Sequence, residues 1–138
     1  MIIEFHDHHG KLDTKIDPFE KLVQTVITSE NYKIKELNII LVTDEFLKDM
    51  HGEYLSDDTE TDVITFDLSE GEEIEAEIYI SYDRALAHCG IYNVELTDEL
   101  ARLLVHGLLH LAGFNDFSED EQLKMRAKED EFLAKYWN

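Results

Sequence analysis

The chain has 138 residues with 32 Asp or Glu against 12 Lys or Arg, and its formal net charge is −20 at pH 7. This composition argues against broad nonspecific binding to nucleic acid, because the affinity of such binding comes from Lys and Arg side chains that neutralise phosphates. A single cysteine excludes an internal disulfide, and no apolar run is long enough to span a membrane. We therefore expect one compact, soluble, cytoplasmic domain over residues 1–138 with no membrane partner.

A strand and a helix are predicted at the beginning of the chain. Apolar side chains within residues 1–5 indicate a short strand, and His6-Asp-His-His9 is expected to be a solvated turn rather than a metal site. Asp17 and Pro18 fit the cap and the first position of a helix. The apolar face of that helix follows the helical period through Phe19, Leu22, Val23, Val26 and Ile27.

The middle of the chain is predicted to contain strands and one helix. Residues 37–42 form a branched apolar run typical of a buried strand, and Thr43 is expected to cap the following helix. The inner face of this helix is expected to comprise Phe46, Leu47 and Met50. Residues 61–67 and 76–81 are further strand patterns, and the connector around Gly71 is expected to pair them antiparallel.

Three helices are predicted in the second half. The first covers residues 82–89 and ends near Gly90, Thr97 is expected to cap a central core helix, and Ser118 begins a capping box. The last helix is expected to run to about Tyr136. Its candidate core contacts are Leu123, Met125, Phe132 and Leu133, and its charges between 119 and 135 are interpreted as a solvated face. The interspersed elements predict an α+β fold with a four-stranded mixed sheet and about five helices.

The central helix carries a pattern typical of a metal site. His106 and His110 are four residues apart, so a helix places them on one face, one turn apart. Both imidazoles can then bind one ion, and Gly113 allows a left-handed turn that brings Asp116 back as a third ligand. Three ligands leave a coordination position open, which indicates a catalytic site and a metal-dependent hydrolase. Two buried histidines satisfied by backbone carbonyls are the alternative.

The residue that follows His106 separates two kinds of hydrolase. The spacing matches the metzincin motif H-E-x-x-H-x-x-G-x-x-H, with Asp in the last place. Metalloproteases of this type use the Glu beside the first His as general base. Here that residue is Gly107, so proteolysis in the zincin manner is not expected.

Three segments resemble those of the YbeY family of endoribonucleases. HGLLHLAGFND at residues 106–116 is similar to the family signature H-G-x-L-H-L-x-G-Y-D-H. TDVITF at 61–66 resembles T-D-V-L-S-F, and EIYIS at 77–81 resembles G-D-I-x-I-S. With the matching order and length, the resemblance covers nearly the whole domain. It implies a zinc-dependent endoribonuclease specific for single strands, acting in maturation of the 16S rRNA 3′ end and in ribosome biogenesis.

The resemblance carries over to individual metal ligands. It makes His106 and His110 the first two ligands and places Asp116 where the family has a third histidine. Aspartate is a competent zinc ligand, although its charge weakens the ion as a Lewis acid and favours harder metals, so another divalent transition metal is an alternative. The family also has a Y-R-x-K-D element whose arginine is thought to serve cleavage. That element reads YLSDD here, with Leu55 in place of the arginine.

Other residues are candidates for catalysis and substrate binding. Arg102 lies one turn before His106 and is a candidate catalytic cation beside a metal-bound water, although pairing with Asp98 or Glu99 is an equal alternative. Candidates for the approach of substrate are Thr61, Asp62 and Thr65. The expected partners are single-stranded RNA or rRNA and a ribosome or assembly factor. The alternatives are a metalloprotease-like or other metal-dependent hydrolase, and a non-catalytic ribosome-assembly factor.

Overall fold

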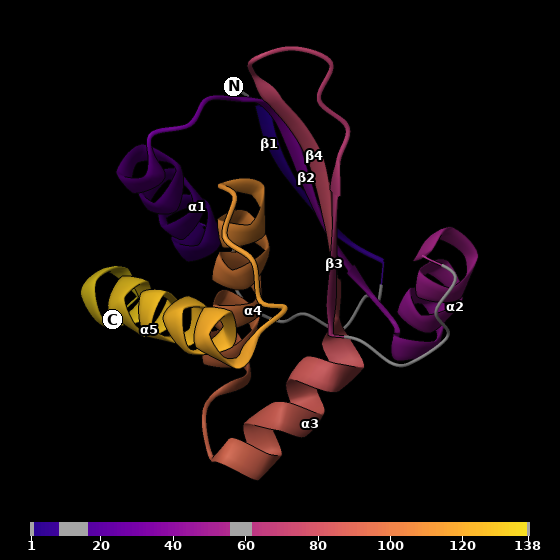
Figure 1. Cartoon of the computed structure of the whole chain (residues 1–138). Coiled ribbons are helices and arrows are strands. Elements are labelled where there is room, and N and C mark those ends of the chain that lie inside the picture. The colour runs from indigo at the N-terminus through magenta and orange to yellow at the C-terminus, as the bar shows by residue number, and fades with distance from the viewer. Residues whose placement is uncertain (1, 9–16, 56–61, 138) are drawn as a thin grey trace.

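The computed structural model describes residues 2–8, 17–55 and 62–137, which form one sheet and five helices (Figure 1). In chain order the elements are β1 (Ile2–Asp7), α1 (Asp17–Glu30), β2 (Ile34–Val42), α2 (Asp44–Leu55), β3 (Val63–Asp67), β4 (Ile74–Ser81), α3 (Tyr82–Tyr92), α4 (Leu96–Leu111) and α5 (Glu119–Tyr136). The predicted α+β class with a mixed four-stranded sheet is confirmed. No helix within these ranges combines the length and apolar character needed to cross a bilayer.

The sheet has the strand order β1-β2-β4-β3. β1 and β4 run parallel to β2, whereas β3 is antiparallel to β4, which confirms the predicted pairing of residues 61–67 with 76–81. The register sets Thr65 opposite Ile78. The two central strands, β2 and β4, are rich in buried branched residues because helices cover both faces of the sheet.

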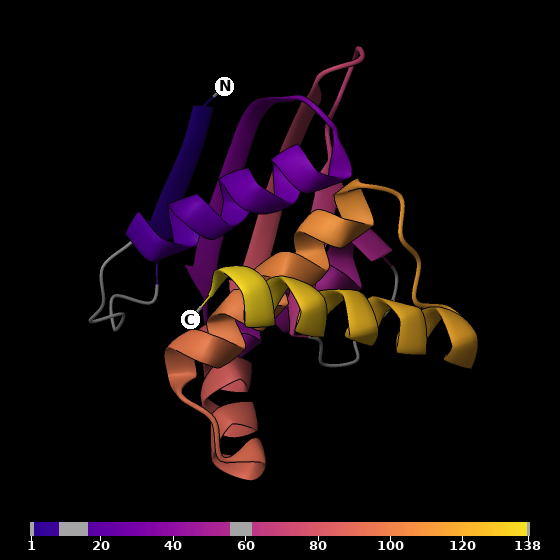
Figure 2. The same ribbon diagram turned by 90° about the vertical axis from the view of Figure 1, so that its left-hand side faces the viewer.

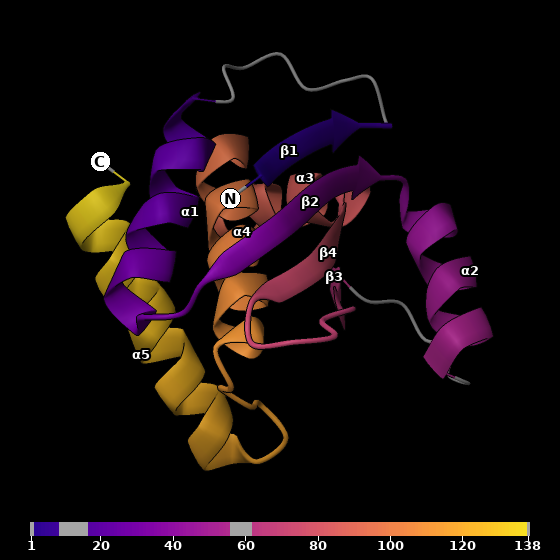
Figure 3. The ribbon, with the colours of Figure 1, turned by 90° about the horizontal axis from the view of Figure 1, so that it is seen from above.

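The two faces of the sheet are covered unequally. Figures 1 and 2 show α1, α4 and α5 gathered on one side of the sheet, and Figure 3 shows α2 on the opposite side. The larger core cluster joins side chains of α1, α4 and α5 to one face of the sheet, among them Leu22, Ile78, Leu104, Leu108 and Phe132. A smaller cluster beneath α2 comprises Ile40, Val42, Leu47 and Ile64. The central helix α4 is therefore held between the sheet and α5.

Side-chain caps mark the starts of α2, α3 and α5. The Thr43 hydroxyl accepts a hydrogen bond from the backbone N–H of Phe46 at 3.1 Å, and Ser118 forms the predicted capping box. The prediction that Thr97 caps the central helix is wrong, because α4 begins at Leu96. The preceding helix α3 continues past its predicted end and stops at Asn93 in the left-handed conformation. Residues 93–95 are then the whole connection, and Thr97 falls inside the first turn.

Two predicted core contacts are wrong. Phe46 is 48% exposed and Leu123 is 69% exposed, whereas Leu47 of α2 is fully buried. α2 covers its face of the sheet alone, so only a narrow stripe of the helix is enclosed. Leu123 borders a groove between α4 and α5 rather than the core.

Gly107 allows α4 to lie close to the sheet. A Cβ atom at this position would stand 3.0 Å from Cγ2 of Ile78 and 3.2 Å from Oγ1 of Thr65. These neighbours belong to β4 and β3, which lie side by side in the sheet. The glycine is therefore a packing requirement, and it leaves no room for the carboxylate that a metalloprotease carries at this place.

Replacing Gly107 with alanine is expected to lower the free energy of unfolding by about 1–3 kcal/mol, because overpacking outweighs the gain in helix propensity. Urea denaturation measures this change. Gly90→Ala is the matched control, since Gly90 also lies inside a helix but its Cβ would meet nothing within 4 Å. That variant is expected to be neutral or more stable by up to ~1 kcal/mol. An equal response of the two variants would contradict this account of Gly107.

Candidate metal centre

The structure brings together the three predicted metal ligands. His106 and His110 lie one turn apart on α4, with their Nε2 atoms separated by 3.1 Å. Oδ2 of Asp116 is 3.3 Å from Nε2 of His106 and 3.5 Å from Nε2 of His110. All three side chains are partly buried, and their candidate ligand atoms all lie within 4.8 Å of one another.

The turn after α4 brings Asp116 to the histidines. Gly113 adopts φ of +102°, a conformation that side chains with a Cβ rarely tolerate. The N–H of Phe114 donates to the carbonyl of Leu109 at 3.0 Å, which closes the end of the helix. The side chain of Gln122 then donates to the backbone carbonyl of Asp116 at 3.1 Å. The third candidate ligand is thus fixed from both sides of its loop.

The spacing of the three atoms fits one small divalent ion. Ligand atoms at about 2.0–2.1 Å from a tetrahedral zinc ion are separated from each other by about 3.3 Å. The observed separations of 3.1, 3.3 and 3.5 Å agree with that value. Two imidazoles and one carboxylate are also a donor set that zinc accepts, and they leave a fourth position open.

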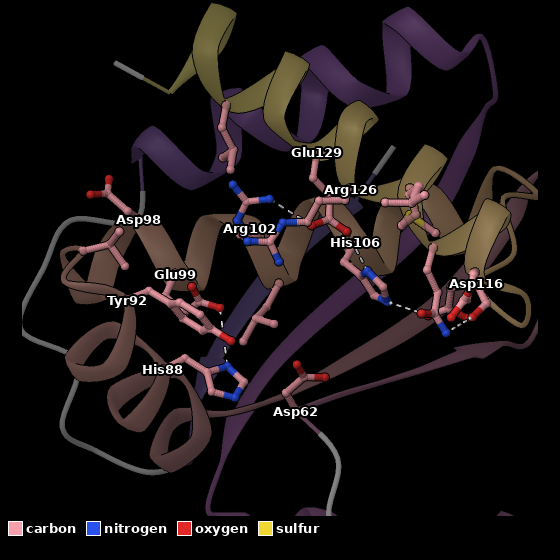
Figure 4. A pocket seen from close by; sticks show the side chains of 17 residues that line it. Asp62, His88, Tyr92, Asp98, Glu99, Arg102, His106, Asp116, Arg126 and Glu129 are labelled. Atoms are coloured by element: carbon pink, nitrogen blue, oxygen red, sulfur yellow. Dashed lines mark hydrogen bonds and ion pairs between the residues drawn. The ribbon is translucent and has the colours of Figure 1, made fainter.

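Glu129 of α5 orients the first of these histidines. Its Oε2 atom lies 2.7 Å from Nδ1 of His106, and the residue is only 4% exposed. A carboxylate on one imidazole nitrogen fixes the proton there and leaves the other nitrogen free for a metal. Nε2 of His106 is therefore the atom that points toward His110 and Asp116, and Figure 4 shows this order of Glu129, His106 and Asp116.

The sequence interpretation missed Glu129, although a signal for it exists. The charges of the last helix were all assigned to a solvated face. Met125, Glu129 and Phe132 nevertheless follow the i, i+4, i+7 spacing of a buried helix face, and all three are buried. A carboxylate on an apolar stripe needs a partner of its own, and that requirement points to a buried cation or histidine.

Arg102 pairs with α5. Its Nη1 donates to Oε1 of Glu129 at 3.1 Å and its Nη2 donates to Oδ1 of Asp130 at 2.6 Å. These partners replace Asp98 and Glu99, which were the alternative considered from sequence. A guanidinium has five N–H donors, so donors remain beyond these two bonds. Arg102 also lines the groove that contains His106.

The charges around His106 change its proton affinity. Burial lowers the pKa of the imidazole, but the hydrogen bond and charge of Glu129, with Asp116 and Asp62 beyond, outweigh burial and raise it. Protons therefore compete for Nε2 of this histidine at a higher pH than for the same atom of a free imidazole. A metal ion that binds Nε2 must displace that proton, so metal affinity rises with pH.

The candidate substrate residues fall in three different places. A groove of about 740 Å³ runs along α4, and Asp62 lies on its wall with His106, Asp116 and Arg102 (Figure 4). Thr65 packs beneath α4 against Gly107, away from that wall. Thr61 lies outside the described residues, and so does the side chain of Leu55.

Comparison with known proteins identifies the family. The family model described as Endoribonuclease YbeY matches residues 3–137. The chain belongs to the YbeY endoribonuclease family. A protein named Endoribonuclease YbeY from Flavobacterium psychrophilum is 44% identical over 111 residues, 80% of this chain and 79% of the relative. Its namesake from Christiangramia forsetii is 37% identical over 132 residues, 96% and 92% of the two chains.

A solved structure supports the same fold. The solution structure of a Thermotoga maritima protein superposes with a TM-score of 0.68 at 25% identity, covering 99% of this chain and 89% of that one. YbeY membership confirms the resemblance drawn from the three motifs, and with it the expectation of an endoribonuclease, a hydrolase of RNA phosphodiester bonds.

The geometry of this YbeY chain predicts the effect of removing the charge on Glu129. Glu129→Gln keeps the shape of the side chain but weakens its bonds to His106 and Arg102. Metal affinity is expected to fall about 10–100-fold while the protein stays folded, as for other residues that support metal ligands. Competition with a chelator measures the affinity, and circular dichroism checks the fold.

Asp130→Asn is the matched control for Glu129→Gln. Asp130 is the other carboxylate that binds Arg102, but it is exposed and does not contact His106. Its loss is expected to leave metal affinity within about twofold, a change of under ~0.5 kcal/mol. Equal losses in both variants would show that Glu129 acts only through Arg102.

Proposed function

We propose that residues 1–138 form one metallohydrolase domain that cleaves single-stranded RNA in the maturation of rRNA, with zinc held by His106, His110 and Asp116. The metal is supported by the separations of 3.1, 3.3 and 3.5 Å between the three ligand atoms. The RNA substrate is supported by the name of the relatives, Endoribonuclease YbeY. The family resemblance is the support for three finer parts of the proposal: cleavage at the 16S rRNA 3′ end, the ribosome as partner, and location in the cytoplasm.

The metal and the surrounding residues have separate roles in the proposed hydrolysis. A zinc ion would polarise a phosphoryl oxygen and lower the pKa of a coordinated water towards ~7. Glu129 keeps the proton of His106 on Nδ1, so that Nε2 stays a ligand. Arg102 offers its remaining N–H donors to a phosphate in the groove, and Asp62 borders the approach. The hydrolysis adds water across one P–O bond and releases two RNA ends.

The packing of Gly107 favours a nuclease over a protease. A metalloprotease needs a carboxylate beside the first metal histidine as general base. In this chain the equivalent Cβ would lie 3.0 Å from Ile78, on the side of α4 that faces the sheet. Position 107 therefore supplies no general base of the kind that a metalloprotease uses.

Asp116 tests the metal centre directly. Asp116→Ala is expected to reduce the zinc content of the purified protein several-fold, because two histidines alone hold the ion weakly. Asp116→His is expected to retain zinc, since imidazole is a ligand of the same reach. Elemental analysis gives the metal content of each variant. Full zinc in the alanine variant would remove Asp116 from the site.

The proposed activity is tested with RNA and with a peptide side by side. Wild-type protein is expected to cut internal bonds of a single-stranded oligoribonucleotide, to lose this activity with chelator, to regain it with zinc, and to spare casein. Arg102→Ala is expected to lower the cleavage rate about 10–100-fold while losing less of its metal, because a cation that stabilises phosphate charge is removed. Metal-dependent peptide cleavage without RNA cleavage would overturn the proposal. Metal binding with neither activity would support the non-catalytic alternative.

A further inference from the structure

The groove continues past the metal centre to a second group of side chains. Glu99, His88 and Tyr92 line its far end, with Arg102 between them and His106 (Figure 4). Glu99 precedes His106 by two helical turns on the same side of α4, a separation of about 10 Å along the axis. The mechanism proposed above uses none of these three residues.

Glu99 is a buried carboxylate that borders the groove beside His88. It is 7% exposed, and its Oε1 lies 3.5 Å from Nδ1 of His88. Across residues 2–8, 17–55 and 62–137, His88 is its only ion-pair partner. A carboxylate can accept about four hydrogen bonds, and Glu99 also lines the groove, where further donors can reach it.

Tyr92 provides an aromatic surface beside this carboxylate. The residue is 61% exposed, and its ring stands edge-on to His88 with centroids 6.2 Å apart. Exposed Tyr and His rings are the platforms on which proteins stack the unpaired bases of single-stranded RNA. A flat ring can stack on the π face of a nucleobase, and a buried acceptor beside it can bind the hydrogen-bonding edge of the same base.

We propose that Glu99, His88 and Tyr92 form a subsite for one nucleobase, with a preference for guanine. Guanine presents adjacent N1–H and N2–H donors, which suit a carboxylate, whereas uracil presents one N–H between two carbonyl oxygens that a carboxylate repels. Tyr92 stacks on the base and Glu99 accepts from its edge. That this base belongs to a cleaved RNA rests on the function proposed above.

The charge of this end of the groove favours a base over a phosphate. Asp98 and Glu99 line it, and their charge repels a phosphate, whereas the Glu99 carboxylate can accept hydrogen bonds from a base edge. Arg102 lies between the subsite and the metal ligands, where the sugar–phosphate chain would pass. The two turns of α4 between Glu99 and His106 then set the base close to the bond that is cut.

Nucleosides test the subsite without cleavage and without phosphate. With the full chain as purified, guanosine is expected to shift the NMR signals of the His88 and Tyr92 rings, and to bind about tenfold more tightly than uridine. Glu99→Gln is expected to remove this preference. Tyr92→Ala is expected to weaken both nucleosides, whereas Tyr92→Phe keeps the ring and the binding. Equal affinity for the two nucleosides, or tighter binding of arginine amide than of guanosine, would overturn the subsite.

Cleavage of four oligoribonucleotides that differ at one position tests the same preference in the reaction. The wild type is expected to cut the guanine-bearing RNA about tenfold faster than the uracil-bearing one, and Glu99→Gln to reduce that ratio towards one. Ile91→Ala is the control, since Ile91 is 73% exposed next to Tyr92 but does not line the groove. Selective guanosine binding without RNA cleavage would refute the proposed function and retain the subsite. RNA cleavage without base preference and without guanosine binding would refute the subsite and leave the proposed function standing.

Discussion

The 3.6-residue period of α4 is the constraint on which both the core and the candidate site depend. Leu100, Leu104 and Leu108 of this helix are buried in the main core. Arg102, His106 and His110 are spaced by four residues along another stripe, and Arg102 and His106 of this stripe line the groove. Because one stripe is held in the core, the helix cannot rotate, and the direction of both imidazoles is set by packing rather than by the metal.

The buried carboxylate of Glu129 couples that helix to α5. Removing a carboxylate from water costs several kcal/mol unless good partners compensate. Here Arg102 and His106, both on α4, bind its two oxygens at 3.1 and 2.7 Å. The same bonds that compensate Glu129 also orient His106, so the packing of α5 on α4 and the geometry of the ligands are one feature. The bond from the Trp137 indole to Asp98, at 2.7 Å, ties the far end of α5 to α4 in the same way.

The sequence predicted those features that depend on local spacing. His106, His110 and the turn at Gly113 could be read directly, because helix period and glycine conformation are local properties. The strand pattern with its antiparallel pair and the capping box at Ser118 were also predicted correctly. The cap at Thr97 was wrong because the end of the preceding helix determined where α4 begins.

Features that depend on tertiary neighbours could not be read in this way. The burial of Glu129 depends on how α5 packs against α4. The local sequence does not show which of the many acids on this helix becomes buried. The partners of Arg102 lie 27 and 28 residues away in sequence. The close approach at Gly107 depends on the register of β3 and β4, and sequence alone left open whether that position faces the groove or the sheet.

The acidity of the chain is consistent with an RNA substrate if bases rather than phosphates provide much of the recognition. Among the described residues that line the groove, Arg102 and Arg126 are the only Lys or Arg side chains. Few phosphates can then be neutralised by the protein, so the electrostatic part of the affinity stays small. Stacking and hydrogen bonds to base edges do not need positive charge, and carboxylates serve them as acceptors. A metal ion would place further positive charge where the scissile phosphate must lie. With the base subsite and the metal centre that we propose, such a groove would hold RNA at one base and at one phosphate and repel the rest of the backbone.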